Sequence, residues 1–155
     1  MTRRIALSLV ATLVFGHSAS RVDAQEKCKP VVGNFEAQVL PTSECNAILC
    51  TEGRVWGGLQ GTYQFKMTTL RSSGVAAIMF FTGISEVTAK SGDLLFGADT
   101  GSVDLGAAGG FASLITFSGG TGAFENASGQ IRLRGELDPV EGTTSGDYLG
   151  SVCTP

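Results

Sequence analysis

Histidine is almost missing from this sequence, because the only one among its 155 residues is His17, near the amino terminus. Residues 1–24 have the pattern of an export signal that is removed after translocation, so the mature chain is expected to contain no histidine. Imidazole is the usual proton shuttle of enzymes and a common zinc ligand. The composition therefore excludes Ser-His-Asp and Cys-His catalysis and His-ligated zinc.

Long hydrophobic runs are missing as well. Two arginines precede the eleven-residue apolar stretch Ile5–Phe15, and small residues stand at the −3 and −1 positions before Gln25, as at a signal-peptide cleavage site. Eleven residues are too few to cross a bilayer, which takes about 20. We therefore expect a signal peptide at 1–24, then one domain over 25–155 that has no membrane span and is secreted or periplasmic.

Clusters of basic residues do not occur. Removal of residues 1–24 takes away three of the 11 basic and one of the 14 acidic residues, which leaves a net charge of about −5. A nucleic-acid-binding domain needs a concentrated positive surface, and so does binding to anionic lipid. Neither nucleic acid nor a membrane surface is an expected partner.

CxxC pairs are absent, although the sequence contains four cysteines. An even number of cysteines in an exported chain is typical of disulfides, and a four-thiolate zinc site would want CxxC-type pairs. The positions favour a Cys45–Cys50 bond that closes a small loop and a Cys28–Cys153 bond that joins the ends, while two other connectivities stay open. We expect no metal and no other cofactor.

Helical periodicity is missing too, and glycines separate runs that alternate between apolar and polar residues or are rich in β-branched and aromatic ones. About eight strands with short turns indicate an all-β antiparallel barrel or sandwich. Gly74–Ala89 is apolar on both faces in its first half, which predicts a strand covered on both sides. The other predicted strands are Val31–Leu40, one short and one long strand within Gly53–Ser72, Gly92–Leu105, Phe111–Gly119, Gly129–Leu137 and Ser145–Cys153.

The glycine-rich stretch Ser118–Gly135 raises the question of a phosphate site. A P-loop needs a lysine after its last glycine, and none follows here. A dinucleotide motif that began at Gly120 would need glycine where Glu125 stands, and a helix where the sequence has strand periodicity. The stretch instead predicts a hairpin in which GGTG supplies positive-φ positions for a tight connection.

The sequence GGTGAFENASG is similar to the Gly-Gly-(Thr/Ser)-Gly-x-Phe-x-x-Ala-x-Gly hairpin of the allene oxide cyclase and dirigent-protein barrel superfamily. The ending DYLGSVC resembles the last strand of bacterial secreted members. The resemblance implies an eight-stranded antiparallel barrel with an interior cavity. In that superfamily the plant enzymes cyclise an allene oxide, and dirigent proteins guide coupling or cyclisation of reactive phenolic intermediates. That chemistry requires no histidine, metal or cofactor. The matching positions are Gly119, Gly120, Thr121, Gly122, Phe124, Ala127 and Gly129.

Candidate site residues follow from an apolar barrel interior. A carboxylate buried among aromatic rings would have a raised pKa and could act as a general acid, whereas on the outer face it would be an ordinary solvated group. Arg132 and Arg134 alternate with apolar residues, which favours a solvent-facing position over an anion site. No catalytic residue is assigned. The candidate ligand-binding residues are Trp56, Tyr63, Phe65, Phe80, Phe96 and Phe117, and the candidate carboxylates are Glu36, Glu86, Asp93, Asp99 and Asp104.

Three functions are compatible with this sequence. The first is a barrel that binds a small apolar molecule without transforming it. The second is a dirigent-like or cyclase-like protein that steers a reactive intermediate. If it is an enzyme, its activity is of the cofactor-free cyclase or isomerase type. This function requires a carboxylate, tyrosine or arginine that points into the barrel. The third is a non-catalytic structural or interaction module of the cell envelope or extracellular matrix, with no ligand and a barrel that is packed solid. The volume and lining of the interior discriminate among the three.

Overall fold

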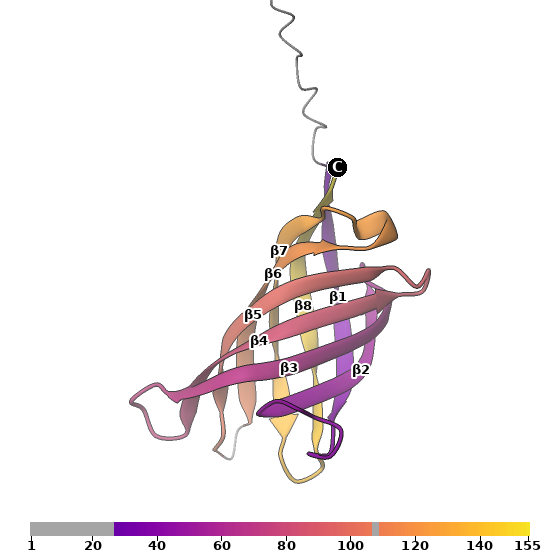
Figure 1. Ribbon diagram of the computed structural model, residues 1–155. Coiled ribbons are helices and arrows are strands. Elements are labelled where there is room, and N and C mark those ends of the chain that lie inside the picture. Colours follow the sequence, from indigo (N-terminus) through magenta and orange to yellow (C-terminus); the bar gives the residue numbers. More distant parts are fainter. Residues whose placement is uncertain (1–26, 107–108) are drawn as a thin grey trace, which may run out of the picture.

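The computed structural model describes residues 27–106 and 109–155, which form a closed antiparallel barrel (Figure 1). Each strand pairs with the next in sequence and β8 pairs with β1, so the all-β eight-stranded barrel expected from the sequence is confirmed. The signal peptide and the domain boundary fall outside the described residues and stay predictions. The strands are β1 (Lys27–Val39), β2 (Leu49–Gly57), β3 (Gly61–Ser72), β4 (Ile78–Ala89), β5 (Leu94–Asp104), β6 (Gly110–Gly120), β7 (Ser128–Asp138) and β8 (Thr143–Thr154).

The two ends of the barrel differ. We call the end with the connections 40–48, 73–77 and 139–142 the mouth. The opposite end, with the connections 58–60 and 121–127, is called the closed end, and the carboxyl terminus lies there (Figure 1). Along most of each strand, residues that point inward alternate with residues that point outward, as the pleat of a barrel requires. The pairing register shifts between Met67 and Thr69 of β3 and between Phe96 and Gly97 of β5.

The glycine-rich stretch forms the predicted hairpin, but its connection is not a tight turn. Seven residues, 121–127, join β6 to β7 and include a short 3-10 helix, η1 (Gly122–Phe124). The Leu94 backbone N–H donates to Thr121 Oγ1 at 2.9 Å, and the Thr121 N–H donates to the Leu94 carbonyl at 2.8 Å. Ala127 is buried in the core. The connection therefore covers the closed end and is attached to the start of β5.

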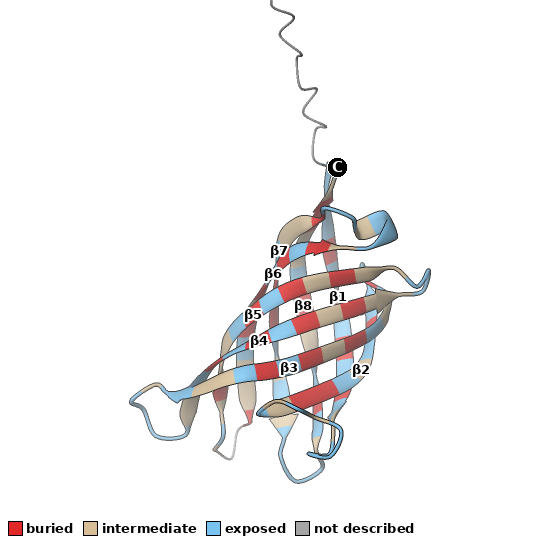
Figure 2. Cartoon of the chain, in the orientation of Figure 1, coloured by how far each residue is buried: buried red, intermediate tan, exposed pale blue. Residues whose placement is uncertain are grey.

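The first half of β4 is not covered on both sides, which corrects the expectation from the sequence. Phe81 points inward and is buried, whereas Phe80 and Ile84 are 55% and 56% exposed on the outer face. Figure 2 shows the alternation of buried and exposed positions along β3, β4 and β5. In this apolar run, the side chains of one face therefore belong to the core, and the apolar side chains of the other face are exposed to solvent.

Both predicted disulfides are present. Cys28–Cys153 joins β1 to β8 where the two strands pair at the closed end, and Cys45–Cys50 fastens the 40–48 connection to the start of β2. The first bond spans 125 positions and the second spans five. The long-range bond therefore locks the β1–β8 seam that closes the barrel.

Two glycines make room for the aromatic rings of the core. A Cβ at Gly83 would overlap the ring of Phe65, and a Cβ at Gly101 would overlap the ring of Phe81. The two rings meet edge to face with centroids 5.6 Å apart, a favourable geometry for aromatic pairs. Large residues packed against glycines on neighbouring strands fill most of the interior.

Tyr148 ties the connection after β2 to the barrel interior. Its hydroxyl accepts the Leu59 backbone N–H at 2.8 Å and lies 3.1 Å from the Trp56 carbonyl, to which it donates. We expect Tyr148→Phe to lower the free energy of unfolding by about 1–3 kcal/mol, because a buried N–H then lacks its acceptor. Urea unfolding measures the loss. Tyr63→Phe removes a hydroxyl bonded to Ser85 and is the matched control; equal losses in both variants would contradict the assignment.

Candidate functional site

A cavity of about 60 Å³ lies inside the barrel on the mouth side. It is smaller than the roughly 150 Å³ cavity that admits benzene. It therefore has room for a few water molecules or for one end of a ligand. Leu49, Phe111 and Leu137 are only partly buried and line the side nearest the mouth. The remaining lining residues are Phe35, Tyr63, Phe65, Met67, Phe81, Val103 and Leu133, with the polar Thr51, Asp99, Ser113 and Thr144.

Asp99 is the buried carboxylate of this cavity, with an exposed fraction of 3%. It lies on β5 between Leu95 and Val103, which share its inward face. The Ser85 hydroxyl donates to Asp99 Oδ2 at 3.2 Å, and the Tyr63 hydroxyl lies 3.2 Å from Ser85 Oγ. An ionised carboxylate only accepts hydrogen bonds. Ser85 therefore accepts from Tyr63 while it donates to Asp99, so the three groups form a chain of hydrogen bonds directed at the carboxylate.

The second carboxylate oxygen, Asp99 Oδ1, is buried and has no hydrogen-bond partner among the described residues. Buried polar atoms of folded proteins nearly always have such a partner. Since Asp99 lines the cavity, the cavity has room for the donor that would pair with this oxygen, a water molecule or an N–H or O–H group of a ligand. The arrangement is suited to receive a hydroxyl or another N–H or O–H group.

Burial raises the pKa of Asp99 from 3.8 to about 6, against the opposing effect of the neighbouring Ser113 and Ser85 hydroxyls and the Thr100 backbone. Burial, and then the charge of Asp99, also raise the pKa of Tyr63, which stays protonated and remains a donor. A carboxyl group with a pKa near the working pH can both accept and return a proton. The site has the elements of general acid–base chemistry.

The predicted aromatic set is divided by the register of the strands. Tyr63 and Phe65 line the cavity, and Phe117 is buried in the core without lining it. Trp56 is 40% exposed and, like Phe80, lies on the outer face. Phe96 pairs with Glu86 between inward pairs on either side, so it also faces outward. The six rings therefore do not surround one interior space, and a ligand-binding role for any of them stays a prediction.

Among the five candidate carboxylates, Asp99 alone is buried. Glu36 and Glu86 lie on the outer face of their strands, and Asp93 and Asp104 accept hydrogen bonds in turns. Ser85 and Ser113 were not among the residues predicted from the sequence. Period-two alternation counted from Val87 would have placed Ser85 inward. Arg132 and Arg134 face solvent, as expected.

In residues 27–106 and 109–155, no group of three or more His, Cys, Asp or Glu side chains is placed to hold a metal ion. No helix in the same ranges is long and apolar enough to cross a membrane.

The fold and the site define a class of protein: a closed antiparallel barrel of eight strands with a small interior cavity that contains a buried carboxylate. Among solved structures, the chain is similar to a pterocarpan synthase dirigent protein, with a TM-score of 0.52 and 14% sequence identity over 84% of this chain and 86% of that chain. At this identity the likeness establishes a dirigent-like barrel fold. A scan against protein-family models and a search of curated proteins find no match.

Proposed function

We propose that this protein is a dirigent-like barrel that holds one end of a small, mostly apolar reactive molecule in the cavity and exchanges a proton with it through Asp99. The observation that carries the proposal is the buried, unpaired Oδ1 of Asp99 on the cavity wall. An unpaired polar atom in the interior is costly. A carboxylate kept there at a cost to stability is typical of functional sites.

The inward position of Asp99 and Tyr63 favours this function over the two others. Binding of an apolar molecule without chemistry needs no carboxylate in the pocket, and an uncharged lining would bind it better. A structural module with a solid barrel would have no cavity beside the carboxylate. The proposed dirigent-like function requires both the cavity and the carboxylate on its wall.

The ligand end that fits this site is a hydroxyl group, phenolic or enolic. Its O–H points to Asp99 Oδ1, while Ser85 donates to Oδ2 and in turn accepts from Tyr63. In the proton transfer the ligand O–H bond breaks, a new O–H bond forms on Oδ1, and the ligand retains the electron pair as a phenolate or enolate. The same proton returns when the product forms, so no cofactor or oxidant is consumed.

Phenol and anisole are matched probes of this site, because anisole has the same ring but no hydroxyl donor. Only the hydroxyl end of phenol enters the cavity beside Asp99, and its ring stays on the mouth side, against the partly buried Leu49, Phe111 and Leu137. We expect phenol to bind and to shift the NMR signals of residues around the cavity, with an apparent affinity that rises about tenfold from pH 5 to pH 7.5. The rise follows the ionised fraction of a carboxyl group with a pKa of about 6, since the ionised form is the better acceptor. Anisole is expected to bind more weakly at both pH values.

The variant Asp99→Asn should weaken phenol binding and remove its pH dependence. Asp147→Asn changes an acidic residue on the outer face and is the matched control. Equal binding of phenol and anisole, or unchanged binding by the Asp99 variant, would refute the proposal.

We also propose that the mature protein works outside the cytoplasm. The two disulfides support this location, because such bonds persist in oxidising compartments. Mass spectrometry of the mature chain from the producing cell tests it: an amino terminus at Gln25 is expected, and an intact residue 1 in a reduced chain would overturn it.

A further inference from the structure

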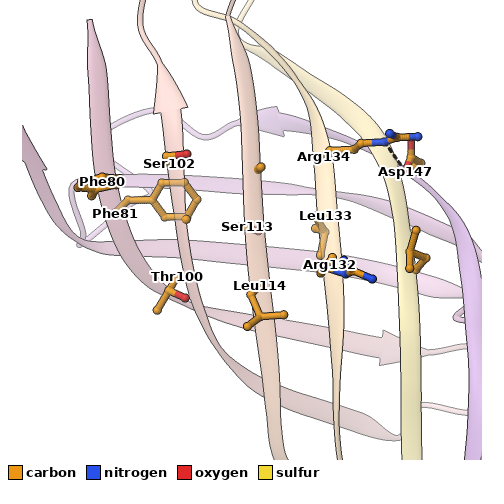
Figure 3. A pocket seen from close by; sticks show the side chains of 13 residues that line it. Phe80, Phe81, Thr100, Ser102, Ser113, Leu114, Arg132, Leu133, Arg134 and Asp147 are labelled. Atoms are coloured by element: carbon orange, nitrogen blue, oxygen red, sulfur yellow. Dashed lines mark hydrogen bonds and ion pairs between the residues drawn. The ribbon is translucent and has the colours of Figure 1, made fainter. Parts of the chain in front are cut away.

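A second hollow, separate from the cavity, lies on the outer face of the barrel. It is a groove of about 800 Å³ that crosses β4 to β8 (Figure 3). Short side chains, Thr100, Ser102 and Ala112, occupy its middle, with Phe80 on the first strand and Leu149 on the last. Ligand sites usually measure about 300–1,000 Å³. The groove is therefore large enough for a whole small molecule, which the interior cavity is not.

Cross-strand pairing makes the middle of the groove continuous. Leu149 pairs with Arg132, Arg132 with Leu114, and Leu114 with Thr100. Side chains directly opposite each other on paired strands have Cβ atoms about 5 Å apart. Arg132 thus stands between two leucines, so a cationic group borders an apolar surface on each side.

Arg132 carries the uncompensated charge of this groove. The other cation, Arg134, donates from Nε to both carboxylate oxygens of Asp147, at 3.1 and 3.0 Å (Figure 3). No hydrogen bond or ion pair joins Arg132 to another residue in the described part of the chain. Asp104 and Glu136 lie in a neighbouring depression toward the mouth. A negative group in the groove is therefore attracted to Arg132 and repelled from the mouth side.

The apolar part of the groove is open to solvent. Phe80 is 55% exposed and Leu149 is 44% exposed. Covering such surface contributes about 25 cal/mol per Å² of apolar area. An occupant with an apolar body gains this contribution, whereas a purely polar anion does not.

We propose that this groove binds a free organic anion with an extended apolar body, of the fatty-acid class. Its carboxylate contacts Arg132, and its chain crosses Ala112 toward Phe80. Neighbouring strands lie about 4.8 Å apart, so the three strand intervals from β4 to β7 give a path of about 14 Å. This site does not involve the interior carboxylate, so it stands independently of the proposed function.

Dodecanoate, used below its micelle-forming concentration, is the test ligand, and dodecyltrimethylammonium is the cationic counterpart with the same chain. Isothermal titration calorimetry measures affinity, and NMR shifts of the β6 and β7 amides locate the site. We expect saturable binding of dodecanoate and none of the cation. Arg132→Gln should weaken binding about tenfold, the effect of one charge-assisted contact.

Three further variants keep the result interpretable. Arg54→Gln removes an exposed arginine on β2, outside the groove, and should leave the affinity unchanged. Ala112→Trp fills the middle of the groove and should reduce the affinity at least tenfold; circular dichroism checks that it folds. Asp99→Asn should bind dodecanoate as the unaltered protein does, which separates the groove from the interior cavity.

Several results would overturn the proposal. One is an equal loss of dodecanoate affinity in Arg54→Gln and Arg132→Gln. The others are saturable binding of dodecyltrimethylammonium and dodecanoate-induced NMR shifts confined to the cavity. Binding to phosphatidylglycerol vesicles but not to free dodecanoate would assign the groove to a membrane surface. Self-association that Ala112→Trp abolishes, seen by analytical ultracentrifugation, would assign it to a second copy of the chain.

Discussion

Asp99→Asn is expected to stabilise the protein at neutral pH by about 3 kcal/mol. The pKa of the Asp99 carboxyl rises from 3.8 to about 6 on folding, and each pKa unit corresponds to about 1.4 kcal/mol. Because the folded state binds this proton more tightly than the unfolded state, the stability is fully present below pH 3.8 and is lost as the pH rises through about 6. The side-chain amide that Asp99→Asn introduces stays uncharged, so the variant does not lose this stability as the pH rises.

Urea unfolding of both proteins from pH 4 to pH 8, with the disulfides intact, measures the difference. The two free energies of unfolding should converge near pH 4 and diverge by about 3 kcal/mol at pH 7.5. Asp147→Asn, on the outer face, should change stability by less than about 1 kcal/mol, as for an exposed ion pair. A difference between the unaltered protein and Asp99→Asn that does not vary with pH would show that the carboxylate is not destabilised by burial.

A lower stability caused by Asp99 bears on function. A residue that lowers the free energy of unfolding at the working pH is retained when it contributes to activity or binding. Functional sites often carry such a cost, and replacing the residue then stabilises the protein while it impairs activity. If Asp99→Asn is more stable at neutral pH and also fails to bind phenol, both results point to the carboxylate as part of the site.

Removal of the Cys28–Cys153 disulfide is expected to have the largest effect on stability, a loss of about 5 kcal/mol. The bond closes a loop of 125 positions, and the loop-entropy relation gives about 5 kcal/mol for a loop of that length. Cys45–Cys50 closes a loop of five, for which the same relation gives about 2 kcal/mol. The double variants with alanine at both cysteines of each pair test the two values.

The two double variants are each other's controls, since each loses one disulfide and the two bonds close loops of very different length. Urea unfolding at one pH should place the Cys28 and Cys153 variant well below the other, and hydrogen exchange should rise first along the β1–β8 seam, where that bond lies. Equal losses would indicate that native-state effects, rather than the unfolded chain, set the contribution of each bond.

Local patterns were sufficient to predict the strands, and less so their ends. Alternation located β7 to within one residue at each end, since Gly129–Leu137 became Ser128–Asp138. The first strand begins four residues before Val31 because Lys27–Pro30 pair with β8, a partner more than 120 positions away. Such pairing leaves no signal in the segment itself.

The site was predictable in part. Tyr63 and Phe65 alternate with Gln64 and Lys66, so the sequence puts the two rings on one face of the strand, and the structure turns that face inward. Phe80 and Phe81 are adjacent and chemically identical, so either could have been the inward ring. The choice depends on register across the barrel, where Phe81 packs against Phe65 and into the space beside Gly101. A shift of one residue would exchange the two faces.

The sequence by itself determined the all-β class, because alternation and composition carry that information, and it favoured the observed pairing of the cysteines over two other connectivities. Only the tertiary structure decided that Asp99, among five candidate carboxylates, faces the interior beside Ser85 and Tyr63. It also decided that the cavity is small, since its volume is what remains after side chains from opposite sides of the barrel have packed. Such packing brings together residues that are far apart in the chain, so it cannot be predicted from a local sequence pattern.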